Sequence, residues 1–354
     1  MDKEYIRLKN FIKSFDDNKP IVMFQSLFNT YRKNIDYIIH KFISSQRYNI
    51  IFVYNEPKGY SCEKLDCAFL IKFEFDLKDV DLVIIDDSHN RHIDTCWGNT
   101  NAPRLLLSHN VILGHNRDYI DYIAVPSKFA YKRMKYSKNN LLKVGYPKLD
   151  VSIKEYNKVK SIKEDAILYA PTLKNLDGFG DIEYLKQHIK EYNYSIGFDY
   201  YILKILLDNF DETIIYRPHP FHQKRNHLYI QLVMQKFKNE SRIILSDDYI
   251  KDYKRAKVMV SDLSQTPYTF SLTTLKPIVT FVPSTQKRGS LDSELADKFG
   301  FRIKNLSAMV DKIKYLLKYN NKFSKKIEKY RDKNIYNIKN STQCLIEEVY
   351  KIVN

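Results

Sequence analysis

Residues 258–272 read VMVSDLSQTPYTFSL, a stretch that joins an apolar run to a helical segment through a short polar turn. The run before Ser261 has the β-branched content of a buried strand. Residues that cap helices follow it, and Pro267 suits the first turn of a helix. At such a helix start, free backbone amides and the positive end of the helix dipole favour an anion. The stretch therefore predicts a strand–turn–helix unit, whose turn either binds phosphate or only caps the helix.

Strands and helices alternate in the same way along both halves of the chain. Apolar runs of strand length lie at residues 20–25, 49–55, 80–86, 104–110 and 122–127, and again at 166–172, 212–220, 241–247, 256–262 and 276–283. Segments of helical length separate these runs. Because strands that alternate with helices form βαβ units, the order predicts an α/β fold with two doubly wound, Rossmann-like parallel sheets. A chain of 354 residues also exceeds what one hydrophobic core usually serves.

Composition divides the chain into three parts. A lysine-rich, weakly patterned linker begins at residue 151, so we expect a first domain at 1–155 and a second at 156–305. Residues 306–354 read as helices with a dense lysine face. We expect these helices to pack back on the body through one apolar stripe, formed by Val310, Ile313, Leu316 and Leu317. Their basic face could rest against anionic lipid headgroups.

The formal net charge is +16, from 58 Lys and Arg against 42 Asp and Glu. This balance favours a nucleic acid, an acidic membrane surface or a phosphate-bearing substrate as partner. Nucleic acid is the least supported of the three, because the lysines are dispersed and form no recognisable module.

The first twenty residues carry charges throughout, and no apolar run approaches the roughly 18 residues that span a bilayer. The four cysteines are scattered without CxxC spacing, which argues against disulfides and zinc. We therefore expect a cytoplasmic protein without a metal or other cofactor, with peripheral contact at the inner face of the cell membrane open to its basic tail.

Four polar clusters follow predicted strands, at the carboxyl ends where ligands bind in open α/β sheets. They lie at residues 108–110, 171–174, 217–220 and 261–264. In the third cluster, RPHP, two prolines hold a loop that carries Arg217 and His219. These side chains either donate hydrogen bonds to phosphate oxygens, or His219 is a buried histidine that satisfies a loop carbonyl.

The order of the motifs LLLSHN, DYIAVPSKFA, VGYPKLD, ILYAPT, YRPHP and RAKVMVSDLSQTPYTFSLTTLKPIVTF resembles the CDP-glycerol glycerophosphotransferase family of teichoic acid and capsule polymerases. The resemblance covers roughly residues 80 to 285. It implies the GT-B fold, in which two Rossmann-like domains face each other across a cleft and C-terminal helices cross back to the first domain. It also implies that the second domain binds a CDP-linked donor and the first domain binds a polysaccharide or lipid-linked acceptor.

The resemblance implies roles for individual residues of the second domain. His219 and Arg217 would hold the donor pyrophosphate, and Ser261, Asp262 and Ser264 match the family's phosphate-binding turn. Further candidates for the nucleotide or its phosphates are Gln265, Thr266 and Thr172.

In the first domain, the family's catalytic base falls on His109, and a histidine has a pKa near working pH. Asn110 and His89 are candidates for acceptor contacts. Attack on the phosphorus attached to glycerol would expel CMP.

Three positions depart from the family pattern. Asn110 and Val111 replace the glycine and threonine that usually follow the base, and Gln265 replaces a serine. Thr269 stands where the family usually has an acidic residue able to hold a ribose hydroxyl. An ordinary GT-B glycosyltransferase with a nucleotide sugar donor therefore stays as an alternative, because the same loops could hold it. A nucleic-acid-binding protein is the third interpretation.

Overall fold

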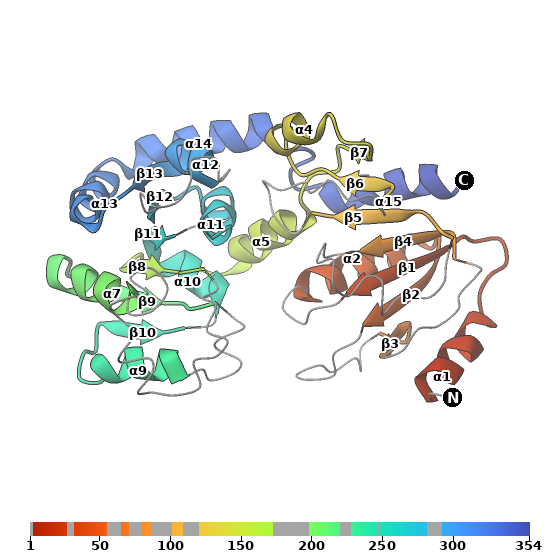
Figure 1. Cartoon of the computed structure of the whole chain (residues 1–354), viewed down its shortest axis with the longest axis horizontal. Helices are drawn as coiled ribbons and strands as arrows, with labels where there is room; N and C mark the ends of the chain where they lie inside the picture. The colour runs from red at the N-terminus through yellow and green to blue at the C-terminus, as the bar shows by residue number, and fades with distance from the viewer. Residues whose placement is uncertain are drawn as a thin grey trace. The chain divides into compact units, whose positions relative to one another are not determined.

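The computed structural model describes residues 3–26, 32–54, 65–70, 80–85, 101–108, 120–172, 198–219, 228–246, 248–262, 264–281 and 292–354 (Figure 1). The chain forms two compact units. The first contains Met1–Val151 and Asn334–Asn354, and the second contains Ser152–Lys333. Each unit holds one parallel sheet with interleaved helices, which confirms the predicted α/β fold.

The sheet of the first unit has the strand order β3-β2-β1-β4-β5-β6-β7, and every neighbouring pair is parallel. Its strands are β1 (Ile21–Ser26), β2 (Asn49–Tyr54), β3 (Ala68–Leu70), β4 (Leu82–Ile85), β5 (Arg104–Leu107), β6 (Tyr122–Ala124) and β7 (Asn140–Leu142). The helices described in this unit are α1 (Lys3–Ile12), α2 (Arg32–Ser45), α4 (Lys128–Met134) and α15 (Ser341–Val353). Helix α5 (Pro147–Lys158) begins in this unit and crosses into the second one after Val151. The edge strands β3 and β7 were not among the predicted strands, because three residues are too few to form a recognisable apolar run.

The sheet of the second unit has the order β10-β9-β8-β11-β12-β13, again parallel throughout. Its strands are β8 (Ala166–Tyr169), β9 (Thr213–Tyr216), β10 (Ile243–Leu245), β11 (Ala256–Ser261), β12 (Ile278–Phe281) and β13 (Gly300–Ile303). Its helices include α7 (Phe198–Asn209), α9 (Leu228–Lys236), α10 (Tyr249–Arg255), α11 (Thr266–Thr274), α12 (Asp292–Phe299), α13 (Met309–Lys318) and α14 (Asn320–Asn334). In both sheets the strand order reverses between two central strands, β1 and β4 or β8 and β11, and this switch point is where such folds bind ligands.

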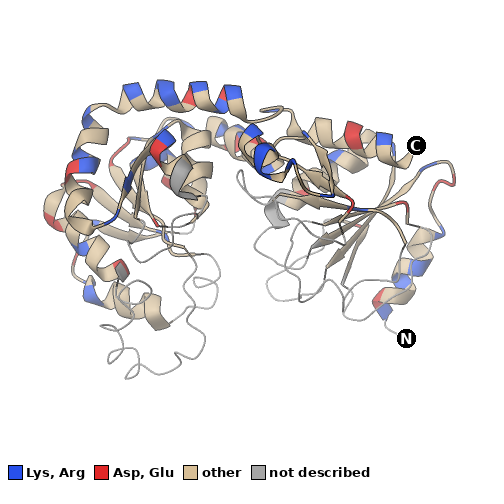
Figure 2. Ribbon diagram, turned by 45° about the horizontal axis from the view of Figure 1, so that its top comes forward, with Lys and Arg blue, Asp and Glu red and all other residues tan. Residues whose placement is uncertain are grey.

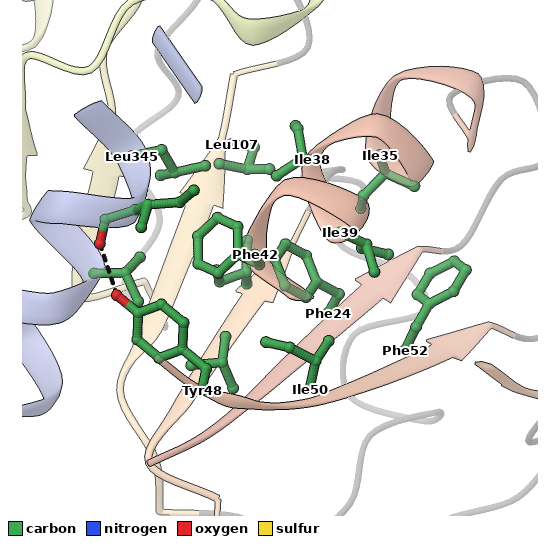
Figure 3. Close-up of a cluster of buried hydrophobic side chains, with 14 of the residues drawn as sticks. Phe24, Ile35, Ile38, Ile39, Phe42, Tyr48, Ile50, Phe52, Leu107 and Leu345 are labelled. Carbon is green, nitrogen blue, oxygen red and sulfur yellow. Dashed lines mark hydrogen bonds between the residues drawn. The ribbon is translucent and has the colours of Figure 1, made fainter. Parts of the chain in front are cut away.

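The sheet of the first unit is covered on both faces by apolar side chains, which explains why its strands read as continuous hydrophobic runs. On one face, Phe24 from β1 meets Phe42 from α2 edge to face, with ring centroids 5.1 Å apart (Figure 3). Leu345 from α15 belongs to the same cluster (Figure 3). The last helix of the chain therefore completes the core of the first unit.

Helix α15 is fixed to the first unit by hydrogen bonds as well as by packing. The hydroxyl of Tyr48 donates to the carbonyl oxygen of Ile346 over 2.7 Å (Figure 3). The carboxylate of Asp150 accepts the backbone N–H groups of Lys339 and Ser341, each over 2.6 Å. Gly145 has a φ of 99°, and a Cβ there would collide with Ser341. The motif VGYPKLD is thus the seat of the returning chain, and the predicted crossing back is confirmed for α15.

The buried carboxylate of Asp150 predicts a pH dependence of stability. Burial raises the pKa of Asp150, although the N–H groups of Ser341 and Lys339 act in the opposite direction. A raised pKa in the folded state means that the folded protein binds this proton more tightly than the unfolded chain does, so protonation of Asp150 stabilises the fold. That contribution to the free energy of unfolding is lost as pH rises through the folded-state pKa. We expect the free energy of unfolding of the wild type, relative to Asp150→Asn, to fall as pH rises from about 4.

Urea denaturation at a series of pH values measures this difference. Asp16→Asn is the matched control, because backbone N–H donation from Asn18 lowers the pKa of exposed Asp16 and reverses the sign. A difference between wild type and Asp150→Asn that stays flat or rises with pH would contradict the assignment.

Helices α13 and α14 belong to the second unit, together with most of the basic tail. Ile313 and Leu316 are fully buried, and α13 packs on β11, β12 and β13, so the predicted apolar stripe faces the body. Figure 2 shows Lys and Arg positions along the ribbons of both helices. The exposed lysines of these helices include Lys314, Lys318, Lys322, Lys325, Lys326 and Lys329. Within the described ranges, no helix combines the length and the apolar character needed to cross a membrane.

Candidate functional site

At the switch point of the second sheet, two side chains at and just after the end of β11 bond to the backbone of the segment that follows β8. Ser261 ends β11, and its hydroxyl donates to the carbonyl oxygen of Ala170 over 2.6 Å. The next residue, Asp262, accepts the backbone N–H of Thr172 at Oδ1 over 2.7 Å. Both Ser261 and Asp262 are fully buried. Because β8 and β11 are neighbours, these two bonds join the turn after β11 to the segment that leaves β8.

Helix α11 starts beside this junction, so the positive end of the helix dipole lies next to it. The hydroxyl of Ser264 accepts the N–H of Thr266 over 3.2 Å, which caps the turn and leaves its own proton for another acceptor. Gln265 precedes the helix without capping it through its side chain, and Pro267 lies in the first turn. Residues 267–274 are all buried, so water screens the dipole of this helix less than that of a surface helix. The turn can therefore attract an anion and cap a helix at once.

Arg217 follows β9, and both its backbone and its side chain are anchored. Its N–H donates to the carbonyl oxygen of Tyr169 over 2.9 Å. Its guanidinium lies near the rings of Tyr249 and Tyr253, with centroids 5.3 and 5.8 Å away, and its Nε is 4.0 Å from Oδ2 of Asp252. The side chain is only 14% exposed. The backbone bond of Arg217 thus fixes the start of the RPHP loop, and its guanidinium is held against the side chains of Tyr249 and Tyr253.

Helix α10 provides the surroundings of this arginine. Burial raises the pKa of Asp252, against the influence of Ser246 and Arg217, and burial also raises the pKa of Tyr253 to about 12. Asp252 accepts a hydrogen bond from the hydroxyl of Ser246 over 2.7 Å. The helix itself is held at its C-terminal end by Lys276, whose Nζ donates to the carbonyl oxygens of Tyr253, Lys254 and Ala256.

The structure places the predicted donor residues in one unit and at the carboxyl edge of one sheet. Hydrogen bonds join Ser261, Asp262 and Thr172, as described above. Half-buried His219 lies three residues beyond the end of β9. The acceptor-side predictions His89, His109 and Asn110 lie outside the described residues. Their neighbour Ser108 is described, and its hydroxyl donates to the carbonyl oxygen of Ala124 over 2.9 Å.

A family model for CDP-Glycerol:Poly(glycerophosphate) glycerophosphotransferase matches residues 98–351. The chain belongs to this family. The match covers more than two thirds of its 354 residues and includes every predicted donor residue of the second unit. This glycerophosphotransferase-family protein is therefore a transferase, as its motifs predicted. A search of curated proteins finds no match to the sequence.

Solved structures with the same architecture include enzymes of the GT-B fold. The wall teichoic acid polymerase TagF superimposes with a TM-score of 0.56 at 13% identity, over 99% of this chain and 94% of that chain. The UDP-GlcNAc 2-epimerase of Methanocaldococcus jannaschii, solved in complex with UDP-GlcNAc and UDP, gives a TM-score of 0.56 at 12% identity, over 94% and 99%. Identities this low establish the fold alone, and the predicted GT-B architecture is confirmed.

One buried residue next to the candidate site was not singled out in the sequence. Asp199, which is 1% exposed, accepts hydrogen bonds from the hydroxyls of Tyr169 and Tyr216. The sequence held one signal for this contact, because the motifs YAPT and YRPHP both begin with a tyrosine, Tyr169 and Tyr216, that ends a strand.

Thr269, at the position where the resemblance predicts an acidic residue, is only 7% exposed and is buried within α11. Among the residues that the structure describes, no three His, Cys, Asp or Glu side chains gather as a metal site would require.

Proposed function

We propose that the protein transfers a glycerol-phosphate-like group from a CDP-activated donor to an acceptor hydroxyl and releases CMP. Membership of the glycerophosphotransferase family supports the reaction class. The observation that carries the proposal is the junction of Thr172, Ser261 and Asp262 beside the start of α11, because it lies at the switch point where open α/β sheets bind nucleotides.

Donor binding uses the second unit. The phosphates accept hydrogen bonds from the turn that contains Ser264, Gln265 and Thr266, where the dipole of α11 favours negative charge. His219 donates from the opposite loop, and Arg217 adds positive charge at short range. Charge neutralisation of this kind supplies most of the catalysis in phosphoryl transfer, together with positioning.

The chemical step exchanges one phosphorus–oxygen bond for another. The acceptor oxygen attacks the phosphorus that carries glycerol, a new P–O bond forms, and the P–O bond to CMP breaks with its electron pair on the departing phosphate oxygen. His109 receives the proton of the attacking hydroxyl. Asn110 and His89 belong to the acceptor side of the site.

The acceptor in this proposal is a polysaccharide or lipid-linked chain of the bacterial surface, such as a capsule, teichoic acid or lipooligosaccharide. The enzyme works in the cytoplasm, against the inner face of the membrane. Nucleic acid has no part in the reaction.

The donor itself tests the proposal. The protein is incubated with CDP-glycerol, CDP-ribitol and a panel of nucleotide sugars, and the nucleotide product is identified by chromatography. Release of CMP from a CDP-linked donor is the expected result. Release of CDP or UDP from a nucleotide sugar would instead establish the glycosyltransferase alternative and overturn phosphotransfer.

Membrane contact through the lysine face of α13 and α14 is expected to depend on anionic lipid. Each lysine near such a surface contributes about 1 kcal/mol, so a Lys318→Gln/Lys322→Gln/Lys325→Gln variant should bind about 100-fold more weakly. Sedimentation with phosphatidylglycerol-containing vesicles measures this affinity.

The matched control replaces three exposed lysines elsewhere, Lys160, Lys163 and Lys238, and should leave vesicle binding within a few-fold of wild type. Equal losses in both variants would show that net charge alone governs the contact.

A further inference from the structure

Two tyrosines and one aspartate form a hydrogen-bonded polar triad inside the second unit. Tyr169 and Tyr216 are the last residues of β8 and β9, and they lie opposite each other in the parallel register. Their rings stack with centroids 5.8 Å apart and planes 13° from parallel. The Tyr169 hydroxyl donates to Oδ1 of Asp199 over 2.5 Å, and the Tyr216 hydroxyl donates to Oδ2 over 2.7 Å. One carboxylate therefore ties the ends of two strands together.

All three residues are removed from water, which defines what they can do. Tyr169 and Tyr216 are fully buried, and Asp199 is 1% exposed. Burial, followed by the nearby charge of Asp199, raises the pKa of both tyrosines well above its ordinary value, so both hydroxyls keep their protons and donate. Apolar side chains of similar size would fill this space without the cost of burying a carboxylate. The polar triad adds a fixed geometry between the ends of β8 and β9, because hydrogen bonds set distances and angles that apolar packing alone leaves adjustable.

The triad stands immediately before both donor loops. Tyr216 is followed by Arg217, whose N–H donates to the carbonyl oxygen of Tyr169 over 2.9 Å. Tyr169 is followed by Ala170, whose carbonyl oxygen accepts the Ser261 hydroxyl, and two residues later the N–H of Thr172 reaches Asp262. A shift of β8 against β9 would consequently move the RPHP loop relative to the turn before α11.

We propose that Asp199 is a positioning residue for the donor site: through Tyr169 and Tyr216 it sets the spacing between the two loops that hold the donor pyrophosphate. The inference rests on the proposed nucleotide site of the second unit. Asp199 is 1% exposed and does not touch the donor; its hydrogen bonds to the two tyrosines carry its effect to the donor loops.

The test measures nucleotide affinity and stability together. Calorimetric titration with CDP and with UDP is applied to the wild type, Tyr216→Phe, Asp199→Asn and Tyr48→Phe. Tyr48→Phe is the matched control, because it also removes one buried tyrosine hydroxyl bond, to Ile346, but in the first unit. Tyr216→Phe and Asp199→Asn are expected to weaken binding of the preferred nucleotide about 10-fold, while Tyr48→Phe lowers the melting temperature and leaves affinity within about twofold.

A fully apolar version of the triad separates positioning from stability. The variant Tyr169→Phe/Tyr216→Phe/Asp199→Leu replaces the polar network with hydrophobic groups, an exchange that is often neutral or stabilising. It is expected to melt no lower than Asp199→Asn and still to bind nucleotide about 10-fold more weakly than wild type. Wild-type affinity in this variant or in Tyr216→Phe would overturn the inference and leave the proposed function standing.

The two nucleotides keep the two proposals apart. If the wild type prefers UDP, the CDP-linked donor is wrong, and the positioning role is judged from the UDP affinities of the same variants. If the wild type binds neither nucleotide, both the donor site and the positioning role are overturned.

Discussion

Replacing His219 by alanine is expected to lower the rate of CMP release from CDP-glycerol by about 1000-fold. The histidine follows the end of β9 by three residues, in a loop whose start is fixed by the Arg217 N–H bond to the carbonyl oxygen of Tyr169. Pro218, which precedes His219, is buried, and its ring fixes the backbone φ angle at that position. A hydrogen-bond donor that is held in place before substrate arrives stabilises the charge that develops in the transition state without reorganisation. Loss of this side chain should therefore lower kcat more than it raises KM.

Steady-state kinetics with CDP-glycerol measure the effect, and His40→Ala is the matched control. His40 is exposed on α2 in the first unit, so the same substitution there should leave turnover within about twofold of wild type. A His219→Ala enzyme with normal kcat would remove this histidine from the phosphate site and favour the buried structural role.

His109→Ala is expected to lower kcat by a similar factor, about 1000-fold, for a different reason. His109 lies outside the described residues, but in the sequence it follows Leu107, the last residue of β5, by two positions. A general base must be unprotonated to act, so the wild-type rate should fall as the pH is lowered through the range in which histidines titrate. Removal of the base should abolish that limb of the pH–rate profile.

The pH profile distinguishes the two histidines. His219→Ala should be slow at every pH and keep the acidic limb, whereas His109→Ala should be slow and flat across it. The acidic limb is measured between about pH 5 and 8, where other side chains rarely titrate. An acidic limb that persists in His109→Ala would assign the base to another residue.

Much of the fold was predictable because its signals are local. The predicted runs at 20–25, 49–55 and 80–86 became the parallel strands β1, β2 and β4, and the run at 256–262 became β11. Buried parallel strands leave continuous apolar runs of recognisable length. Strand β13 was missed because its four residues, GFRI, include an arginine and form no continuous apolar run. The other edge strands that were missed, β3 and β7, have only three residues each.

The donor side of the site was predictable for a related reason. Parallel strands end at one edge, so polar residues after successive strands must converge there. Asp262 and Thr172 do so through a hydrogen bond that spans 90 residues of sequence. The sequence did not show that the guanidinium of Arg217 would pack near Tyr249 and Tyr253, because those rings come from a separate helix, α10.

The sequence by itself determined the α/β class, the strand–turn–helix unit around Ser261 and the order of the family motifs. Each of these depends on residue types within a short window. Only the tertiary structure decided that VGYPKLD seats α15, where Asp150 and Ser341 meet across 191 residues, and that Asp199 ties Tyr169 to Tyr216. A buried carboxylate is stable only beside its donors, and the fold alone determines which distant donors reach it.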